Sequence, residues 1–370
     1  MTTTIRAKSP ADLLATIPVL VGFVPTQSVV FLALRGPLQN AVLRVDLPDA
    51  ASPAILKRFA TQAIGMLCRI TDVEAIVLAV HTEEHIAPGL PHAEFVDILL
   101  RRLRQAGFRV HDALCWAGNG WGSYLDSEVP SGGHPLSDLD ESASRLPHAL
   151  RPTPSEALIP DATSAARERM QRDLAHYRAL VADLDDSDDD PPELEPLCDL
   201  PMFVEEALTW NIAERDAKGA LLLFALQGPP VRDATMLQWA FGFELGDPLY
   251  DEAERFARDG LDLDNERSNM LGNLWMGIGP RPDQTRIERG IGLLLTLVSR
   301  AEPQERRAPL CMLAWLSWAL GSGTRAGKFI DEARAIDAKY GMAELLDTML
   351  SNGLLPEWVF TDPDEGGHAL

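Results

Sequence analysis

The chain has 370 residues, more than a single hydrophobic core usually serves, so we expect two domains. Its 33 Lys and Arg residues stand against 55 Asp and Glu, and the resulting net charge of -22 at pH 7 repels phosphate backbones and anionic bilayers. We therefore expect neither nucleic acid nor a membrane as a partner. The hydrophobic content of 46% is that of a folded protein, and no apolar run approaches the roughly 20 residues that span a bilayer, so a cytoplasmic location is expected.

The first predicted element is a helix that begins at Ser9. The Ser9 hydroxyl can accept from the free amides of the first turn, and Pro10 fits that turn with its φ already set. Asp12 complements the positive end of the helix dipole. Proline has no backbone N–H, so Pro18 is expected to end this helix early, before a run of breaker residues at 22–25.

A β-hairpin is expected next, because an apolar run at 28–34 and an alternating run at 41–46 flank an Arg-Gly-Pro turn. The pattern then predicts a helix over 52–67, a strand over 73–80, a helix over 92–106 and a strand over 108–116. The last two strands and their helix form a βαβ unit, which crosses over in the right-handed sense. This order predicts an α/β domain with a mixed β-sheet covered by helices.

The segment after the last predicted strand changes in composition. Residues 119–136 are rich in Gly, Ser, Asp and Pro and indicate a long loop, and residues 137–160 are expected to be extended. A charged helix follows over 163–184, then an acidic hinge over 183–190. An acidic run of this kind is usually a solvated linker, because adjacent carboxylates without a turn-forming glycine lack the geometry of a calcium loop.

From residue 201 the sequence shows only helical periods, separated by Gly, Pro or Asp. Short connections between amphipathic helices indicate antiparallel stacking. We therefore divide the chain into an α/β domain (1–136), a linker with one charged helix (137–200), an all-α helical array (201–360) and a tail (361–370). The helices are expected over 203–216, 220–226, 232–241, 251–258, 264–274, 285–299, 309–320, 325–340 and 342–350.

The four cysteines are separated by tens of residues and include no C-x-x-C pair, so each is expected to be a buried thiol. They are Cys68, Cys115, Cys198 and Cys311. The sequence contains neither a phosphate-binding loop nor a G-x-S-x-G elbow. We expect no cofactor and no metal.

One helical pair resembles a tetratricopeptide unit, in which small residues let two helices approach closely. The residues that carry this resemblance are Leu310, Leu313 and Ala314, Gly321 at the turn, and Ala326, Ile330 and Ala333. Ala338 and Ser317 depart from the usual pattern, where a proline and an aromatic residue are expected.

The chain also resembles, over nearly its full length, the actinobacterial domain-of-unknown-function family 4192. Segments that carry the resemblance include Ser9–Leu14, Pro18–Pro25, Ser28–Val30, Leu43–Pro48, Trp121–Tyr124, Val231–Asp233, Leu313–Ala319 and Leu355–Trp358. The resemblance implies no activity. Members often have cysteines after the Trp-x-Ser-Tyr segment, and residues 125–135 here have none, so cysteine chemistry in that loop is not expected.

A His-x-x-Glu-His pattern at residues 81–85 matches that of inverted zinc peptidases. Zinc binding there requires both histidines on one helical turn. The pattern follows a strand directly and Pro88-Gly89 interrupts the chain soon after, so we favour a polar loop at a strand end.

Five residues are candidates for ligand binding. Arg44 and Asp46 share one face of a strand, and with Asp12 they form either a polar cluster that holds a small anion or activates a hydroxyl, or a structural ion pair, which is the commoner arrangement. Trp121 and Tyr124 lie in the glycine-rich loop, where aromatic side chains either stack on a ligand or fold back onto their own domain.

Two functions remain open from the sequence. The first is a non-catalytic interaction or scaffold protein whose helical array binds a protein partner. The alternative is a small-molecule-binding or hydrolytic enzyme with its site at the edge of the α/β sheet. We favour the first, because no set of residues dictates a reaction.

Overall fold

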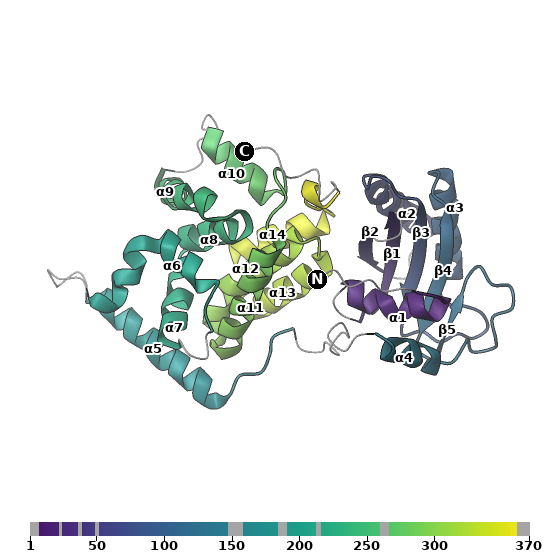
Figure 1. Ribbon diagram of the computed structural model, residues 1–370, viewed down its shortest axis with the longest axis horizontal. Helices are drawn as coiled ribbons and strands as arrows, with labels where there is room; N and C mark the ends of the chain where they lie inside the picture. The colour runs from purple at the N-terminus through teal and green to yellow at the C-terminus, as the bar shows by residue number, and fades with distance from the viewer. Residues whose placement is uncertain are drawn as a thin grey trace. The chain divides into compact units, whose positions relative to one another are not determined.

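The computed structural model describes residues 7–21, 24–35, 39–48, 52–146, 158–183, 191–211, 216–259 and 266–360. Contacts divide the chain into two units, residues 1–156 and 157–370. Within the described residues, all the strands belong to the first unit, and the second unit is built from helices (Figure 1). The predicted fold class, an α/β region followed by an all-helical region, is confirmed.

The first unit contains a five-stranded mixed sheet in the order β2-β1-β3-β4-β5. β1 pairs antiparallel with both β2 and β3, β3 pairs parallel with β4, and β4 pairs antiparallel with β5. The predicted hairpin and the parallel pair of the βαβ unit are therefore confirmed. The strands are β1 (Ser28–Arg35), β2 (Gln39–Asp46), β3 (Ala75–His81), β4 (Val110–Ala117) and β5 (Gly120–Ser123).

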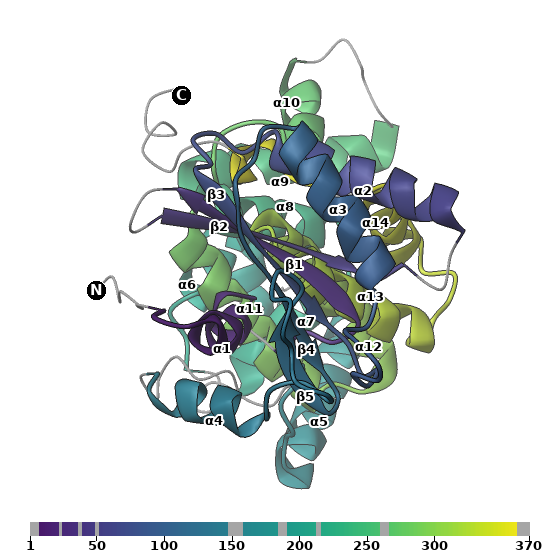
Figure 2. The ribbon, with the colours of Figure 1, turned by 90° about the vertical axis from the view of Figure 1, so that its right-hand side faces the viewer.

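Helices cover both faces of this sheet (Figure 2). The helices α1 (Pro10–Val21) and α4 (Ser137–Ser144) lie on one face, and α2 (Pro53–Leu67) and α3 (Ala93–Gln105) lie on the other. Side chains alternate along a strand, so even-numbered β1 residues such as Val30 and Leu32 face α1, where they form a core with Leu14 and Ile17.

Three predictions for this unit were wrong. α1 continues through Pro18 to Val21, because Pro18 is buried with its neighbours and that packing outweighs one missing backbone hydrogen bond. Part of the expected 119–136 loop forms β5, and part of the expected extended segment 137–160 forms α4, which packs against α1. Glycine in β5 and serine with aspartate in α4 hid these elements, because both compositions are typical of turns.

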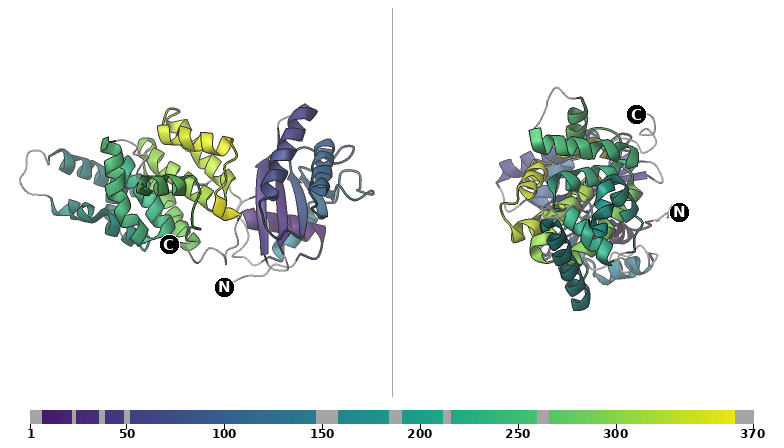
Figure 3. Two further views of the ribbon diagram at one scale, coloured as in Figure 1. Left: turned by 90° about the horizontal axis from the view of Figure 1, so that it is seen from above. Right: turned by 90° about the vertical axis from the view of Figure 1, so that its left-hand side faces the viewer.

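The second unit is an array of helices that pack around one hydrophobic core (Figures 1 and 3). It begins with α5 (Ser164–Ala182), which packs against α7. The other elements are η3 (Pro192–Asp199), α6 (Leu200–Ala207), α7 (Asp216–Ala225), α8 (Pro229–Phe241), α9 (Phe243–Asp259), α10 (Glu266–Trp275), α11 (Gln284–Arg300), α12 (Pro303–Ala319), α13 (Gly323–Ile336), α14 (Gly341–Ser351) and η5 (Glu357–Val359). Each of the helices expected after residue 201 has a counterpart here.

Two helix starts were predicted too late. α9 and α12 begin well before Pro248 and Pro309, which lie inside these helices. The predicted starts, at 251 and 309, followed the rule that proline interrupts a helix. In α12 every residue from Ala308 to Ala319 is buried, so tertiary packing stabilises the turn around Pro309.

Trp315 and Trp318 of α12 pack in the core of the second unit, as expected. Both are fully buried, with ring centroids 6.1 Å apart. Their indole N–H groups donate to backbone carbonyl oxygens, Trp315 to Trp275 at 3.1 Å and Trp318 to Leu354 at 2.7 Å. These bonds remove the penalty of burying an indole N–H, so the cluster ties α12 to the chain segments on either side of it.

The expectation of four buried thiols was wrong for two of them, since Cys68 and Cys198 are exposed. Cys115 and Cys311 are buried, and burial raises their pKa to about 11 and about 12. Among the helices that the structure describes, none combines the length and the apolar character needed to cross a bilayer.

Candidate functional site

The candidate residues on the sheet lie at opposite edges of it. Arg44 and Asp46 are on β2, whereas Trp121 is on β5 and Tyr124 follows that strand directly. β1, β3 and β4 lie between them. Four strand spacings of about 4.8 Å separate the two edges by about 19 Å, so these residues do not converge on one small ligand.

Asp12 lies in the first turn of α1 and is used within the fold. Its carboxylate accepts from the backbone N–H of Lys8 at 3.0 Å and pairs with Arg145, which follows α4, at 3.4 Å. Burial opposes the charged form, but the hydrogen bonds from Lys8, Ser142 and Ser9 outweigh it and hold the pKa of Asp12 below its usual value. Asp12 therefore joins the start of α1 to the end of α4.

Trp121 and Tyr124 fold back onto their own unit. Trp121 is 8% exposed, its indole N–H donates to Asp138 of α4 at 3.3 Å, and its ring stacks on His134 at 4.5 Å. The Tyr124 hydroxyl donates to the carbonyl oxygen of Pro91 at 2.6 Å, and burial raises the pKa of this hydroxyl. Because of strand alternation the two side chains lie on opposite faces of the sheet.

The His-x-x-Glu-His segment lacks the helix that zinc peptidase chemistry requires. His81 is the last residue of β3, and no helix begins before Ala93. His81 is buried and His85 is exposed, so the two rings do not share a helical face. Among the described residues, no cluster of three or more His, Cys, Asp or Glu side chains could hold a metal ion.

Arg44 and Asp46 form the ion pair that their spacing favours, with a guanidinium-to-carboxylate distance of 2.7 Å. Arg44 also donates to the carbonyl oxygen of Thr26 at 3.2 Å. The two partners differ in exposure, since the Arg44 side chain is 9% exposed and the Asp46 side chain is 80% exposed. Burial is the main cause that lowers the pKa of Arg44, and Asp46 opposes it.

A cavity of about 440 Å³ lies in the helical unit, between the end of α6 and one face of α11. Its volume falls within the range of about 300–1,000 Å³ that is usual for ligand pockets. Residues from α11 recur at helical spacing along its wall. The lining residues are Ala207, Leu208, Trp210, Asn211, Arg289, Gly292, Leu293, Thr296 and Arg300.

This cavity is cationic and carries one aromatic ring. Arg289 is exposed and makes no hydrogen bond or ion pair among the residues that the structure describes. Arg300 pairs with Asp216 at 2.6 Å, and Lys218 lies 5.6 Å from the centre of the Trp210 ring. On a protein of net charge -22, the two arginines of the lining are a local concentration of positive charge.

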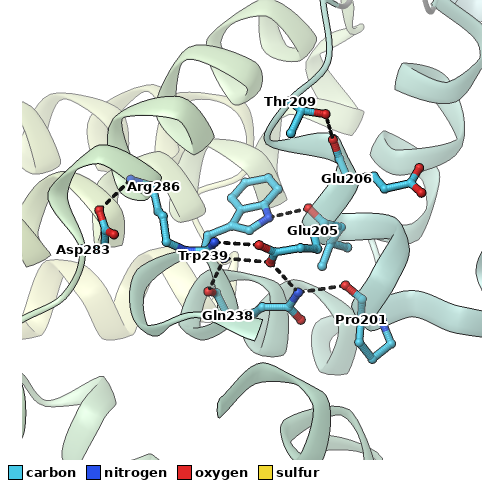
Figure 4. A network of polar contacts seen from close by, with 9 residues as sticks. Pro201, Glu205, Glu206, Thr209, Gln238, Trp239, Asp283 and Arg286 are labelled. Atoms are coloured by element: carbon cyan, nitrogen blue, oxygen red, sulfur yellow. Dashed lines mark hydrogen bonds and ion pairs between the residues drawn. The ribbon is translucent and has the colours of Figure 1, made fainter. Parts of the chain in front are cut away.

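A partly buried polar network holds α6 and α11, which form the two walls of this cavity, against each other (Figure 4). Arg286 of α11 donates to both carboxylate oxygens of Glu205 on α6, at 2.6 and 2.7 Å. Gln238 of α8 also donates to Glu205, at 3.0 Å, and to the carbonyl oxygen of Pro201 at 2.8 Å. The hydrogen bonds from Arg286 are the largest of the causes that lower the pKa of Glu205. A bidentate pair of this kind sets orientation as well as distance, so α6 and α11 are held in one geometry.

Residues 10–256 and 283–357 match the family described as a domain of unknown function (DUF4192). The chain belongs to this family. Comparison with curated proteins and with solved structures finds no match.

The DUF4192 match includes both walls of the cavity, which the sequence reasoning missed. Arg289, Gly292 and Arg300 lie on one face of α11, and this face is visible in the sequence as a helical period. Nothing in the sequence indicates that Trp210, about 80 residues earlier in the chain, packs beside that face. A site assembled from distant helices has no local motif.

Proposed function

We propose that this protein is a non-catalytic cytoplasmic binding protein whose helical unit holds an acidic segment of a protein partner in the cavity between α6 and α11. The observation that carries the proposal is the exposed guanidinium of Arg289, which has no partner among the described residues and shares the cavity with Arg300 and Trp210. Guanidinium groups bind carboxylates through paired hydrogen bonds, and an indole ring offers apolar area beside them.

The arrangement of the α/β unit supports this function over the alternative of an enzyme at the sheet edge. Such an enzyme needs Asp12, Arg44, Asp46, Trp121 and Tyr124 to act on one substrate. Each of them has a partner within the fold, and the β2 and β5 residues lie at opposite edges. Groups that are paired off and about 19 Å apart cannot act together on a small molecule.

The helical architecture also suits partner binding. We interpret the antiparallel pair α12 and α13 as a tetratricopeptide-like hairpin, with Gly321 at its turn in a left-handed conformation (φ 78°). Stacked helical pairs offer extended surfaces to partners. We take residues 1–136 and 201–360 as the two domains, with residues 137–200 as the linker and residues 361–370 as a tail. We also infer an actinobacterial origin.

The test uses a fluorescein-labelled peptide of six glutamates as the probe and the full-length protein as the binder. Fluorescence anisotropy should show saturable binding of this peptide. A hexalysine control should show no saturable binding, because the net charge of -22 attracts it only diffusely. Arg289→Ala should weaken binding about tenfold, because one charge-assisted contact is lost. Trp210→Ala should weaken it by a smaller factor.

Arg58→Ala is the matched control, because Arg58 is also an exposed arginine and lies on α2 in the other unit. It removes the same charge and should leave the affinity unchanged. Equal weakening by Arg58→Ala and Arg289→Ala would show that only overall charge matters and would refute the cavity. Failure of hexaglutamate to bind to the wild-type protein would refute the acidic partner.

A further inference from the structure

One row of side chains crosses the whole sheet on the α1 face. The strand register pairs Asp46 with Ser28, Ser28 with His81, His81 with Trp116 and Trp116 with Trp121. Side chains directly opposite each other on neighbouring strands lie about 4.5–5.5 Å apart at Cβ. The row lies at the carboxyl ends of the parallel strands β3 and β4, which is the edge where α/β sheets usually bind ligands.

Two members of this row are buried with polar atoms that lack a partner. Ser28 is 0% exposed and His81 is 2% exposed, and among the residues that the structure describes neither Ser28 Oγ nor His81 Nε2 has a hydrogen-bond partner. Leaving such an atom unpaired destabilises the fold, because a buried polar group has lost its hydrogen bonds to water. Ser28 on β1 and His81 on β3 are in register, so these two unpaired polar groups lie side by side.

Arg44 brings a positive charge to the same place. Its side chain is almost fully buried, and its contact with Asp46 brings it beside the Ser28 end of the row. Burial, followed by the charge of Arg44, lowers the pKa of His81 to about 3. His81 is therefore neutral at pH 7, and in the tautomer with a proton on Nε2 its ring is a hydrogen-bond donor.

The order of the row argues against a hydrolytic triad. In a Ser-His-Asp triad the acid holds the far side of the histidine, so histidine lies between the other two. Here Ser28 lies between Asp46 and His81, and the acid is two strand spacings, about 10 Å, from the ring. Asp46 cannot orient His81, so the row is suited to binding and not to acyl transfer.

We propose that Ser28, Arg44 and His81 form a binding site for a small oxyanion, a carboxylate or a phosphate group. Each of the three offers a donor: the Ser28 hydroxyl, the Arg44 guanidinium and the His81 ring N–H. The anion takes the place of the Asp46 carboxylate on Arg44. Asp46 can leave at small cost, because its side chain is 80% exposed and rehydrates when it turns outward.

This site goes beyond the partner binding proposed above, since it lies in the other unit and takes a small molecule. Trp116 lies next in the row, with its ring 5.4 Å from that of His81, so the body of the ligand can rest on an indole ring. This site keeps only Arg44 of the five candidate residues from the sequence as a ligand-binding group. It does not include Asp12, Trp121 or Tyr124.

The test measures binding of inorganic phosphate and, in a second arm, acetate to the full-length protein at constant ionic strength. The readouts are the melting temperature and the ¹³Cε1 resonance of His81 in histidine-labelled protein, assigned by its absence in His81→Gln. Phosphate or acetate should raise the melting temperature and shift this resonance, and the arm with the higher affinity identifies the ligand class.

Ser28→Ala separates a ligand site from a structural role. It deletes an unpaired hydroxyl, so without anion the melting temperature should stay equal or rise, whereas anion affinity should fall about tenfold. Asp46→Asn removes the competing carboxylate and should tighten anion binding about tenfold, and Arg44→Gln should abolish it. Arg101→Gln, at an exposed position on α3, should leave binding unchanged.

Two results would overturn the proposal. If neither anion moves the His81 resonance, the donors have no oxyanion ligand. If Ser28→Ala lowers the melting temperature without anion and leaves anion affinity unchanged, the Ser28 hydroxyl binds a structural water and not a ligand.

Discussion

Two arginine–carboxylate pairs, one in each unit, have different constructions. In the helical unit, Arg286 holds Glu205 through two hydrogen bonds, and both side chains are about a quarter exposed or less. In the α/β unit, the Arg44 side chain is 9% exposed, whereas that of its partner Asp46 is 80% exposed, and the two approach to 2.7 Å. The first pair is closed on itself, and the second has one partner that faces water.

This difference separates a structural pair from an exchangeable one. Gln238 adds a third contact to Glu205, so an incoming anion has no free position there. Arg44 faces, in Asp46, a carboxylate that is 80% exposed, and within the described part of the chain the neighbouring Ser28 Oγ and His81 Nε2 have no hydrogen-bond partner. Charge pairs with equal distances therefore have different consequences, because exposure of the acid decides whether it can be displaced.

The largest expected effect comes from breaking the closed pair. Arg286→Met leaves Glu205 charged and mostly enclosed, and we expect a loss of about 2–4 kcal/mol in the free energy of unfolding. Arg44→Met leaves Asp46 in water, and we expect a loss of about 1 kcal/mol or less. Urea unfolding at pH 7, followed by circular dichroism, measures both.

The double variant Glu205→Gln with Arg286→Met is the control for this comparison. Removing the charge of Glu205 should restore part of the stability that Arg286→Met loses, because the unpaired carboxylate is the main source of the penalty. Equal losses for Arg286→Met and Arg44→Met would contradict the distinction between the two pairs.

Two glycines of α11 compare the face of this helix that packs against Trp239 with the face that lines the cavity. A Cβ on Gly290 would lie 2.7 Å from the Trp239 ring, whereas a Cβ on Gly292 meets no atom within 4 Å. Gly290→Ala should therefore cost about 1–3 kcal/mol through overpacking. Gly292→Ala, on the cavity wall, should stabilise the protein by about 0.5–1 kcal/mol, because alanine loses less backbone entropy in a helix.

Thermal unfolding of the two variants checks this contrast. Gly292→Ala also places a methyl group inside the proposed peptide site, so it should weaken hexaglutamate binding while it raises the melting temperature. A destabilised Gly292→Ala variant would show that the cavity wall is packed as tightly as the wall next to Trp239.

The sequence predicted the elements well where patterning is local and failed where packing overrides it. Alternation and helical periods identified β1 to β4 and the helices after residue 201. The errors at Pro18, Pro248 and Pro309 share one cause, since buried neighbours stabilise a helix through a proline that the local rule treats as an end. β5 was missed because it is short and contains two glycines.

The candidate sites show the same division. The Arg44–Asp46 pair follows from the period of one strand and was predicted correctly as an ion pair. Ser28 also had a usable signal, because it shares the strand parity of the buried Val30. The position of Ser28 opposite His81 depends on the pairing of β1 with β3, which no local sequence pattern specifies. The cavity between α6 and α11 has the same origin in tertiary packing.

The smallest expected effect is a pH dependence of the closed pair. Hydrogen bonds from Arg286 lower the pKa of Glu205 in the folded protein, so the folded state favours the carboxylate. The pair therefore adds stability above the unfolded pKa of Glu205, near 4.5, and this contribution is lost as the pH falls through the lower folded value. Glu205→Gln lacks the titrating group, so the difference in urea midpoint between this variant and the wild type should be greatest at pH 6 to 7 and should narrow toward pH 3. The difference in urea midpoint between Arg286→Met and the wild type should also narrow toward pH 3, because without the guanidinium the pKa of Glu205 is no longer lowered. A midpoint difference between Glu205→Gln and the wild type that stays constant from pH 7 to pH 3 would mean that the Glu205–Arg286 pair stabilises the fold through shape and hydrogen bonding alone. The contrast with the exchangeable Arg44–Asp46 pair would then rest on geometry and not on charge.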